Sequence, residues 1–129
     1  MFVPPARLGI HYPEKGLQRF ISRLGLGVTK RILLAIETFP SHTLVDIGFV
    51  DYLVQRDNLQ ERSHKLAAEL MQLAPLSLET MKATLNEIAR GEIDSEKVKS
   101  RISLCAKSVD HQEAMRARAE KRPAVFTRQ

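Results

Sequence analysis

The sequence has one cysteine, Cys105, and no tryptophan among its 129 residues. A single thiol excludes an internal disulfide and supplies no spaced set of metal ligands. No apolar run approaches the ~20 residues that a membrane-spanning helix requires. The N-terminus also lacks the basic-then-apolar order of a secretory signal. These absences predict a cytoplasmic protein without a membrane segment, a disulfide framework or a bound metal.

Aromatic residues are scarce, at 5% of the chain, and no nucleic-acid-reading motif is present, which argues against a nucleic-acid partner. The net charge is +5, and residues Arg116 to Gln129 alone carry a net +4. Such a tail can attract nucleic acid, an anionic membrane surface or a phosphorylated small molecule. Basic residues are also favoured at a helix C-terminus by the helix macrodipole, which explains many of these charges without a ligand.

Helical periodicity covers nearly the whole chain. Apolar residues spaced i, i+3, i+4 and i+7 predict a helix over Leu17–Leu24, which Gly25 and Gly27 interrupt. A second apolar series predicts a helix over Val28–Phe39, ended by Pro40.

The next segment changes character. Ser41 is a candidate N-cap for a short helix that reaches Asp46. Ile47–Val54 is the only stretch with strand character, since it is rich in β-branched and aromatic residues. Asp57 is then expected to cap a long helix that runs through Leu73.

Three further helices are expected in the last third of the chain. Pro75 suits the first turn of a helix that Gly91 ends. The next helix is expected over Asp94–Lys107, and the last over Asp110–Lys121, stopped by Pro123. The sequence therefore predicts a single all-α domain, residues 1–129, with at most one short strand.

The opening segment Phe2–Phe20 contains three prolines and two glycines, which is typical of a tight loop that leads into a helix. It resembles the segment that crosses the active site in the crotonase (enoyl-CoA hydratase/isomerase) superfamily, roughly Phe-x-x-Pro-Glu-x-x-Leu-Gly. Where the hydratases of that family place a catalytic Glu after the proline, this chain has Ala6. The order Leu-Gly-x-x-Tyr-x-x-x-Gly around Tyr12 resembles the methylmalonyl-CoA decarboxylase branch.

Four later segments are similar to crotonase segments, in the same order and at the same spacing. They are Phe39–Asp51, Ala74–Lys82, Ser108–Met115 and Glu120–Phe126. The resemblance is to the C-terminal region of the superfamily. It implies the helical part of a crotonase-like fold, without the N-terminal ββα spiral that holds CoA and supplies most of the oxyanion hole.

This resemblance implies a division of labour along the chain. Residues 1–16 would form a loop of the acyl-CoA site, and residues 17–129 a helical region for trimerisation and for covering the acyl-CoA. Two peptide N–H groups normally polarise the thioester carbonyl, and both are expected outside this sequence. The isolated chain is therefore expected to be inactive.

Candidate catalytic residues lie in the opening loop. The methyl group of Ala6 cannot transfer a proton, so an ordinary two-Glu hydratase mechanism is not expected. Glu14 lies nearby and could substitute, although a solvated carboxylate is the simpler interpretation. Tyr12 could act near the acyl group, as the decarboxylase resemblance implies, or could be a half-buried loop residue.

Candidate CoA-binding residues lie in the closing motif. The resemblance implies that Lys121, Arg122 and Phe126 touch the phosphates and adenine of CoA, often across a subunit boundary. Arg118 departs from the family, which usually has Phe at that position. No tightly bound cofactor is expected; a CoA thioester would be the substrate.

The remaining histidines and the cysteine are expected to be surface or packing residues rather than parts of a site. His42, His64 and His111 lie on different predicted helices without metal-ligand spacing. Cys105 shares an apolar helix face with Ile102, which favours a buried packing thiol.

Two apolar helix faces would be left uncovered without the family's other half. They comprise Ile32, Leu33 and Ile36, and Leu78, Met81 and Leu85. Large uncovered apolar patches seldom persist on monomers, so a homo-oligomer is expected, either a dimer or the family's trimer.

Three functions remain open at this point. The chain is the C-terminal part of an enoyl-CoA hydratase/isomerase acting on acyl-CoA thioesters, inactive alone. Alternatively, it is part of a decarboxylase-like crotonase that uses Tyr12. The third alternative is a non-catalytic helical oligomerisation module.

Overall fold

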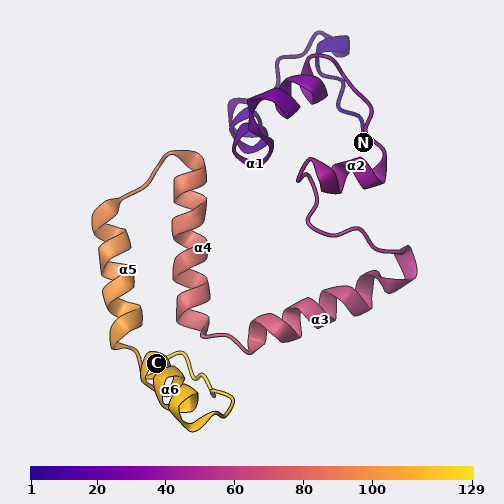
Figure 1. The fold of residues 1–129 in the computed structure, drawn as a ribbon. Helices are drawn as coiled ribbons and strands as arrows, with labels where there is room; N and C mark the ends of the chain where they lie inside the picture. The colour runs from indigo at the N-terminus through magenta and orange to yellow at the C-terminus, as the bar shows by residue number, and fades with distance from the viewer. The chain divides into compact units, whose positions relative to one another are not determined.

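The computed structural model describes all residues, from Met1 to Gln129, and contains helices and no strand. It divides into two compact units, Met1–Gln55 and Arg56–Gln129 (Figure 1). The all-α prediction is confirmed. No helix is long and apolar enough to cross a membrane. The functional boundary predicted at residue 16 stays a prediction, whereas the contacts divide the chain after Gln55.

The first unit is built on α1 (Glu14–Leu33), with a 3-10 turn η1 (Ala6–Leu8) before it and α2 (Ser41–Asp46) after it. Gly25 bends α1 because its backbone angles, φ 73° and ψ 167°, lie in a region essentially restricted to glycine. The predicted interruption is therefore confirmed at Gly25. Gly27 stays within the helix, so the second predicted break is wrong.

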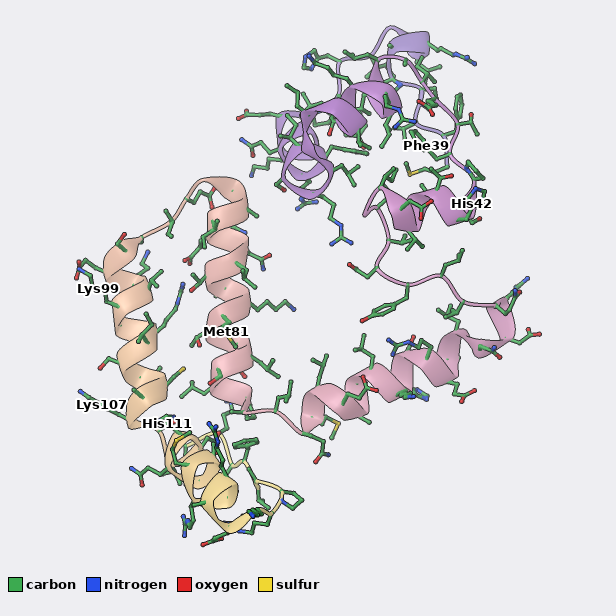
Figure 2. All side chains as sticks on the ribbon, viewed as in Figure 1. Phe39, His42, Met81, Lys99, Lys107 and His111 are labelled. Atoms are coloured by element: carbon green, nitrogen blue, oxygen red, sulfur yellow. The ribbon has the colours of Figure 1, made fainter.

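The core of this unit forms where α1 ends. α1 stops at Leu33, not at Phe39 as predicted, because Ile36 takes a left-handed conformation (φ 53°). Phe39 (labelled in Figure 2) then returns to pack against Ile32 and Leu33. Ile32 and Phe39 are only 0% and 1% exposed. The expectation that Ile32 and Leu33 form an uncovered face is therefore wrong.

Polar contacts fix the turn after α1. The guanidinium of Arg31 donates two hydrogen bonds to the carboxylate of Glu37, at 2.6 and 2.8 Å. The amide of Phe39 donates to the carbonyl of Met1 at 3.1 Å, and the Met1 amino group donates to the Phe39 carbonyl. The N-terminal segment is thereby tied to the buried Phe39.

Ile47–Val54, the one stretch with strand character, forms no strand. The amides of Phe49 and Val50 both donate to the carbonyl of Leu44, at 2.8 and 3.2 Å, so they close the end of α2. Arg23 of α1 holds this segment by donating to the Gly48 carbonyl (2.7 Å) and to Asp51 (2.8 Å). With no neighbouring strand, β-branched residues have no ladder to join.

Two predicted helix caps are also wrong. Ser41 is the first residue of α2 rather than its cap, since Pro40 occupies the cap position and no side chain caps the helix. Asp57 lies inside a 3-10 turn, η2 (Arg56–Asn58), and α3 (Leu59–Met71) begins after it without a side-chain cap.

The second unit continues with α4 (Pro75–Arg90), α5 (Ser95–Lys107) and α6 (Val109–Glu120). Two predicted signals at the ends of these helices are confirmed. Pro75 occupies the first turn of α4, and Gly91 ends α4 in a left-handed conformation (φ 70°). The Asp94 carboxylate caps α5 by accepting from the amides of Glu96 and Lys97, at 3.0 and 3.1 Å.

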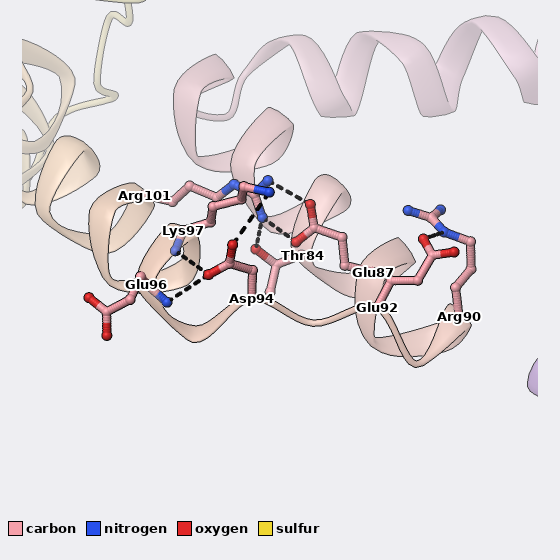
Figure 3. A network of polar contacts seen from close by, with 8 residues as sticks. All are labelled: Thr84, Glu87, Arg90, Glu92, Asp94, Glu96, Lys97 and Arg101. Carbon is pink, nitrogen blue, oxygen red and sulfur yellow. Dashed lines mark hydrogen bonds and ion pairs between the residues drawn. The ribbon is translucent and has the colours of Figure 1, made fainter.

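α4 and α5 lie side by side and run antiparallel (Figure 1). One arginine joins them (Figure 3). Arg101 of α5 donates to both carboxylate oxygens of Glu87 on α4, at 2.6 and 2.8 Å, and to the hydroxyl of Thr84 at 3.0 Å. A bidentate pair of this kind fixes the register of two helices as well as adding electrostatic stabilisation.

A single buried residue, Ser108, forms the corner between α5 and α6. Its hydroxyl donates to the Cys105 carbonyl at 2.7 Å and accepts from the His111 amide at 3.0 Å. One side chain therefore satisfies backbone groups at the end of one helix and at the start of the next.

Candidate functional site

Tyr12 is half-buried in the opening loop. Its ring meets the ring of Phe20 edge-on, with centroids 5.7 Å apart. The same ring lies over Gly16, where a Cβ would come within 2.5 Å of a ring carbon. The Tyr12 hydroxyl forms no hydrogen bond within the chain.

The other residues predicted for the acyl site lie on the surface of the first unit. Ala6 is the exposed first residue of η1, in a turn closed by the amides of Leu8 and Ile10 on the Pro5 carbonyl, both at 3.0 Å. Glu14 is exposed in the first turn of α1, where its carboxylate accepts from Gln18 at 3.2 Å. An acid at a helix N-terminus is stabilised by the macrodipole, which accounts for Glu14 without catalysis.

The closing motif folds back along α6 as a non-helical segment, Arg122–Gln129, which we call the C-terminal strap. It begins where α6 ends and returns to the start of the helix, where the Val109 amide donates to the Gln129 carbonyl at 2.7 Å. Between these points, two carboxylates of α6, Asp110 and Glu113, accept from amides of the strap.

Asp110 is 1% exposed, and both of its carboxylate oxygens accept hydrogen bonds from the strap. One oxygen accepts from the Thr127 amide at 2.7 Å and the other from the Arg128 amide at 3.0 Å. Hydrogen bonds to a charged group are roughly twice as strong as those between neutral groups. Arg128 adds an ion pair to Glu79 of α4, at 2.9 and 3.0 Å.

Glu113 makes the second attachment. Its carboxylate accepts from the Arg122 guanidinium at 2.5 and 3.1 Å and from the Val125 amide at 3.2 Å. These bonds, chiefly those from Arg122, lower the pKa of Glu113 from 4.5 to about 2. The Arg122 Nε donates to Glu120 at 2.5 Å, so the guanidinium is committed to protein partners.

The three residues predicted to contact CoA therefore differ in whether their side chains are free to bind a ligand. Arg122 is held by two carboxylates, and Phe126 is half-buried in the strap. Lys121 is exposed, forms no ion pair and ends α6 in a left-handed conformation, φ 55° and ψ 38°. Lys121 is the member of the set whose charge is free.

The second unit also carries an apolar groove of about 390 Å³ between α4 and α5. Met81 and Leu85 line it and are 56% and 65% exposed, as expected for an uncovered face. Cys105 is half-buried in the groove, with its sulfur 3.4 Å from the Thr80 hydroxyl. Ile102 is 64% exposed, so the predicted buried apolar face around Cys105 is only partly formed.

The four histidines are exposed, and His42 and His111 lie on α2 and α6 (Figure 2). No group of three or more His, Cys, Asp or Glu side chains is placed to hold a metal ion.

Comparison with known proteins identifies the family. The sequence profile of the enoyl-CoA hydratase/isomerase family matches residues 2–129. The chain belongs to this family. Among its curated relatives, a crotonyl-CoA hydratase of Syntrophomonas wolfei is 30% identical over 125 residues. A methylmalonyl-CoA decarboxylase of Escherichia coli is 21% identical over 126 residues.

The chain spans about half the length of these enoyl-CoA hydratase/isomerase relatives, covering 95% of itself and 48% of each of them. Solved structures of the family agree. A family protein from Hyphomonas neptunium matches with a TM-score of 0.85 at 28% identity, over 97% of this chain and 48% of that one. An enoyl-CoA hydratase from Bacillus anthracis matches in fold, with a TM-score of 0.83 at 19% identity, over 99% and 50% of the two chains.

Sequence reasoning missed two residues of this enoyl-CoA hydratase/isomerase chain, Asp110 and Glu113. Both stood inside a motif that served only to mark the family resemblance. Their i, i+3 spacing places them on one face of α6, and that spacing is a usable signal for two side chains with a common target. Their partners are backbone amides up to eighteen residues away. Because every residue except proline has such an amide, the residue types in the sequence do not reveal these partners.

Proposed function

We propose that this chain is the C-terminal part of an acyl-CoA enzyme and that each of its two units carries a segment for CoA thioesters. In the first unit the segment is the opening loop, residues 1–16, and in the second it is the end of α6 with its free Lys121. The family match over residues 2–129 carries the proposal.

Charge supports the assignment of CoA contact to the end of α6. Of the basic residues in the last fourteen positions, Arg122 and Arg128 are bound to carboxylates. Arg118 and Lys121 are exposed without an ion pair and lie three residues apart at the end of the helix. Both cations lie at the same end of α6, where they can attract the phosphate groups of CoA.

The reaction type is proposed on different grounds. Ala6 presents a methyl group where a hydratase would present a carboxylate, so the loop lacks a proton-transfer group at that position. The unbonded Tyr12 hydroxyl favours a second candidate, a decarboxylase-like reaction in which Tyr12 contacts the acyl group. Similarity to the E. coli decarboxylase is consistent with this candidate.

Turnover and binding assays on residues 1–129 test the proposal. We expect CoA binding in calorimetric titration, with neither hydration of crotonyl-CoA nor decarboxylation of methylmalonyl-CoA. Tyr12→Phe is the matched variant, because it keeps the ring against Phe20 and removes only the hydroxyl. Turnover by this polypeptide would contradict its proposed inactivity, and absence of CoA binding would contradict the proposed site.

A further inference from the structure

We propose that Asp110 and Glu113 are positioning residues, which clasp the C-terminal strap to α6 and thereby hold Lys121 in place for its ligand. In this arrangement Arg122 is part of the clasp and does not contact the phosphates. The inference rests on the proposed CoA site at the end of α6 and specifies which residues build it.

The clasp is attached to the backbone of the strap rather than to its side chains. Asp110 accepts from two successive amides, and Glu113 accepts from the amide of Val125. Since backbone donors are the same for every residue type, these bonds fix the path of the strap whatever side chains it carries. Ala124 and Phe126 are half-buried while Val125 and Thr127 are exposed, which is the alternation of an extended segment lying against a surface.

Glu113 and Arg122 form the end of the clasp that borders Lys121. The guanidinium donates to Glu113, to Glu120 and to the Pro123 carbonyl, and the Arg122 amide donates to the Ala117 carbonyl at 3.0 Å. Arg122 is thus fixed at both its backbone and its side chain. The residue immediately before it has little freedom left in its backbone.

Lys121 shows the consequence of that restraint. A left-handed conformation normally selects glycine at the end of a helix, and it is unfavourable for a residue with a Cβ. The chain nevertheless places a lysine there, exposed and without an ion pair. Such a conformation persists when the surrounding structure enforces it, and an exposed ammonium next to a fixed strap suits an anionic ligand.

Amide hydrogen exchange on the intact chain tests the clasp without any ligand. In the wild type, the amides of Val125, Thr127 and Arg128 should be protected. Asp110→Asn should expose Thr127 and Arg128, because an amide side chain offers only one acceptor to two donors. Glu87→Gln is the matched control, since it breaks a similar bidentate pair on α4 and should leave the strap protected. Unprotected strap amides in the wild type would overturn the inference.

A double-mutant cycle with CoA tests the positioning. Lys121→Ala and Glu113→Gln should each weaken CoA binding about two- to fivefold, the range of one exposed charge contact. If Glu113 acts through Lys121, the double variant should bind no more weakly than Lys121→Ala alone. Additive losses, or no loss in Glu113→Gln, would overturn the positioning role while leaving the proposed function intact.

The variant Lys121→Gly distinguishes a role of Lys121 in binding CoA from a role in stabilising the fold. Glycine relieves the left-handed strain, so the melting temperature should rise while CoA binding weakens. A protected strap in a chain that does not bind CoA would refute the proposed function, and the positioning role with it. Equal CoA affinity of the wild type and Lys121→Gly would refute the role of Lys121.

Discussion

At the residue scale, Gly16 and Gly27 of α1 differ in how much space surrounds them for an alanine side chain. At Gly16 an added Cβ would lie 2.5 Å from the Tyr12 ring, whereas at Gly27 nothing lies within 4 Å. Gly16→Ala should therefore destabilise the first unit by about 1–3 kcal/mol through overpacking. Gly27→Ala should stabilise it by about 0.5–1 kcal/mol through helix propensity.

Urea denaturation followed by circular dichroism distinguishes these two effects. The near-ultraviolet signal of tyrosine should also change in Gly16→Ala, because the ring of Tyr12 must move. Two variants of equal stability would show that Tyr12 does not pack on Gly16 as described.

Residue roles that depend on local chemistry could be predicted from the sequence, and those that depend on distant partners could not. Pro75 and Gly91 act as the sequence indicates, because the end of a helix is decided within a few residues. The family resemblance implies a CoA contact for Arg122, whereas the structure pairs its guanidinium with Glu113, nine residues away. Residue type alone cannot say which of two anions an arginine meets.

At the scale of elements, Ser108 connects α5 to α6 through a single hydroxyl that serves both helices. Ser108→Ala removes a helix cap and leaves a buried carbonyl with one bond fewer. It should cost about 1–2 kcal/mol in unfolding free energy. Ser103→Ala, at an exposed position within α5, is the control and should be neutral or slightly stabilising. Equal melting temperatures of the two variants would contradict the role of Ser108.

The attachment of the strap to α6 predicts a local dependence on pH. Glu113 has a pKa of about 2 in the folded chain against an ordinary 4.5, because Arg122 and the Val125 amide bind its charged form. The stabilisation is fully present above pH 4.5 and is lost as the pH falls through about 2. The Val125 amide chemical shift in NMR should follow this titration, and the step should vanish in Glu113→Gln. A titration midpoint near pH 4.5 would contradict the pairing of Glu113 with Arg122.

Helices with clear ends could be predicted at this scale, and irregular segments could not. α4, α5 and α6 lie within two residues of their predicted bounds because proline, glycine and capping residues mark them. Ile47–Val54 has strand composition but no partner strand, and its amides serve the end of α2 instead. The helix ends at Leu33 because the chain turns back to pack Phe39 into the core, and the sequence near Leu33 does not reveal this contact.

At the scale of the whole molecule, the α4–α5 surface leads us to expect self-association. Met81, Leu85, Ile88 and Ile102 are each more than half exposed. A patch of this kind is usually covered by a partner. Light scattering should show a species larger than a monomer, and Leu85→Lys should shift the distribution toward the monomer. Asn86→Lys adds the same charge about 100° around the helix and should have less effect. A wild-type monomer at micromolar concentration would contradict the expectation.

We propose that this member of the enoyl-CoA hydratase/isomerase family binds CoA at the end of α6 and at its opening loop. A titration of CoA into the ¹⁵N-labelled 129-residue chain, followed residue by residue by NMR, tests this proposal. We expect shift changes centred on Lys121, with Arg118 and the amides from Ala6 to Tyr12 also affected. Saturable shifts confined to the α4–α5 groove, or no shifts at millimolar CoA, would contradict it.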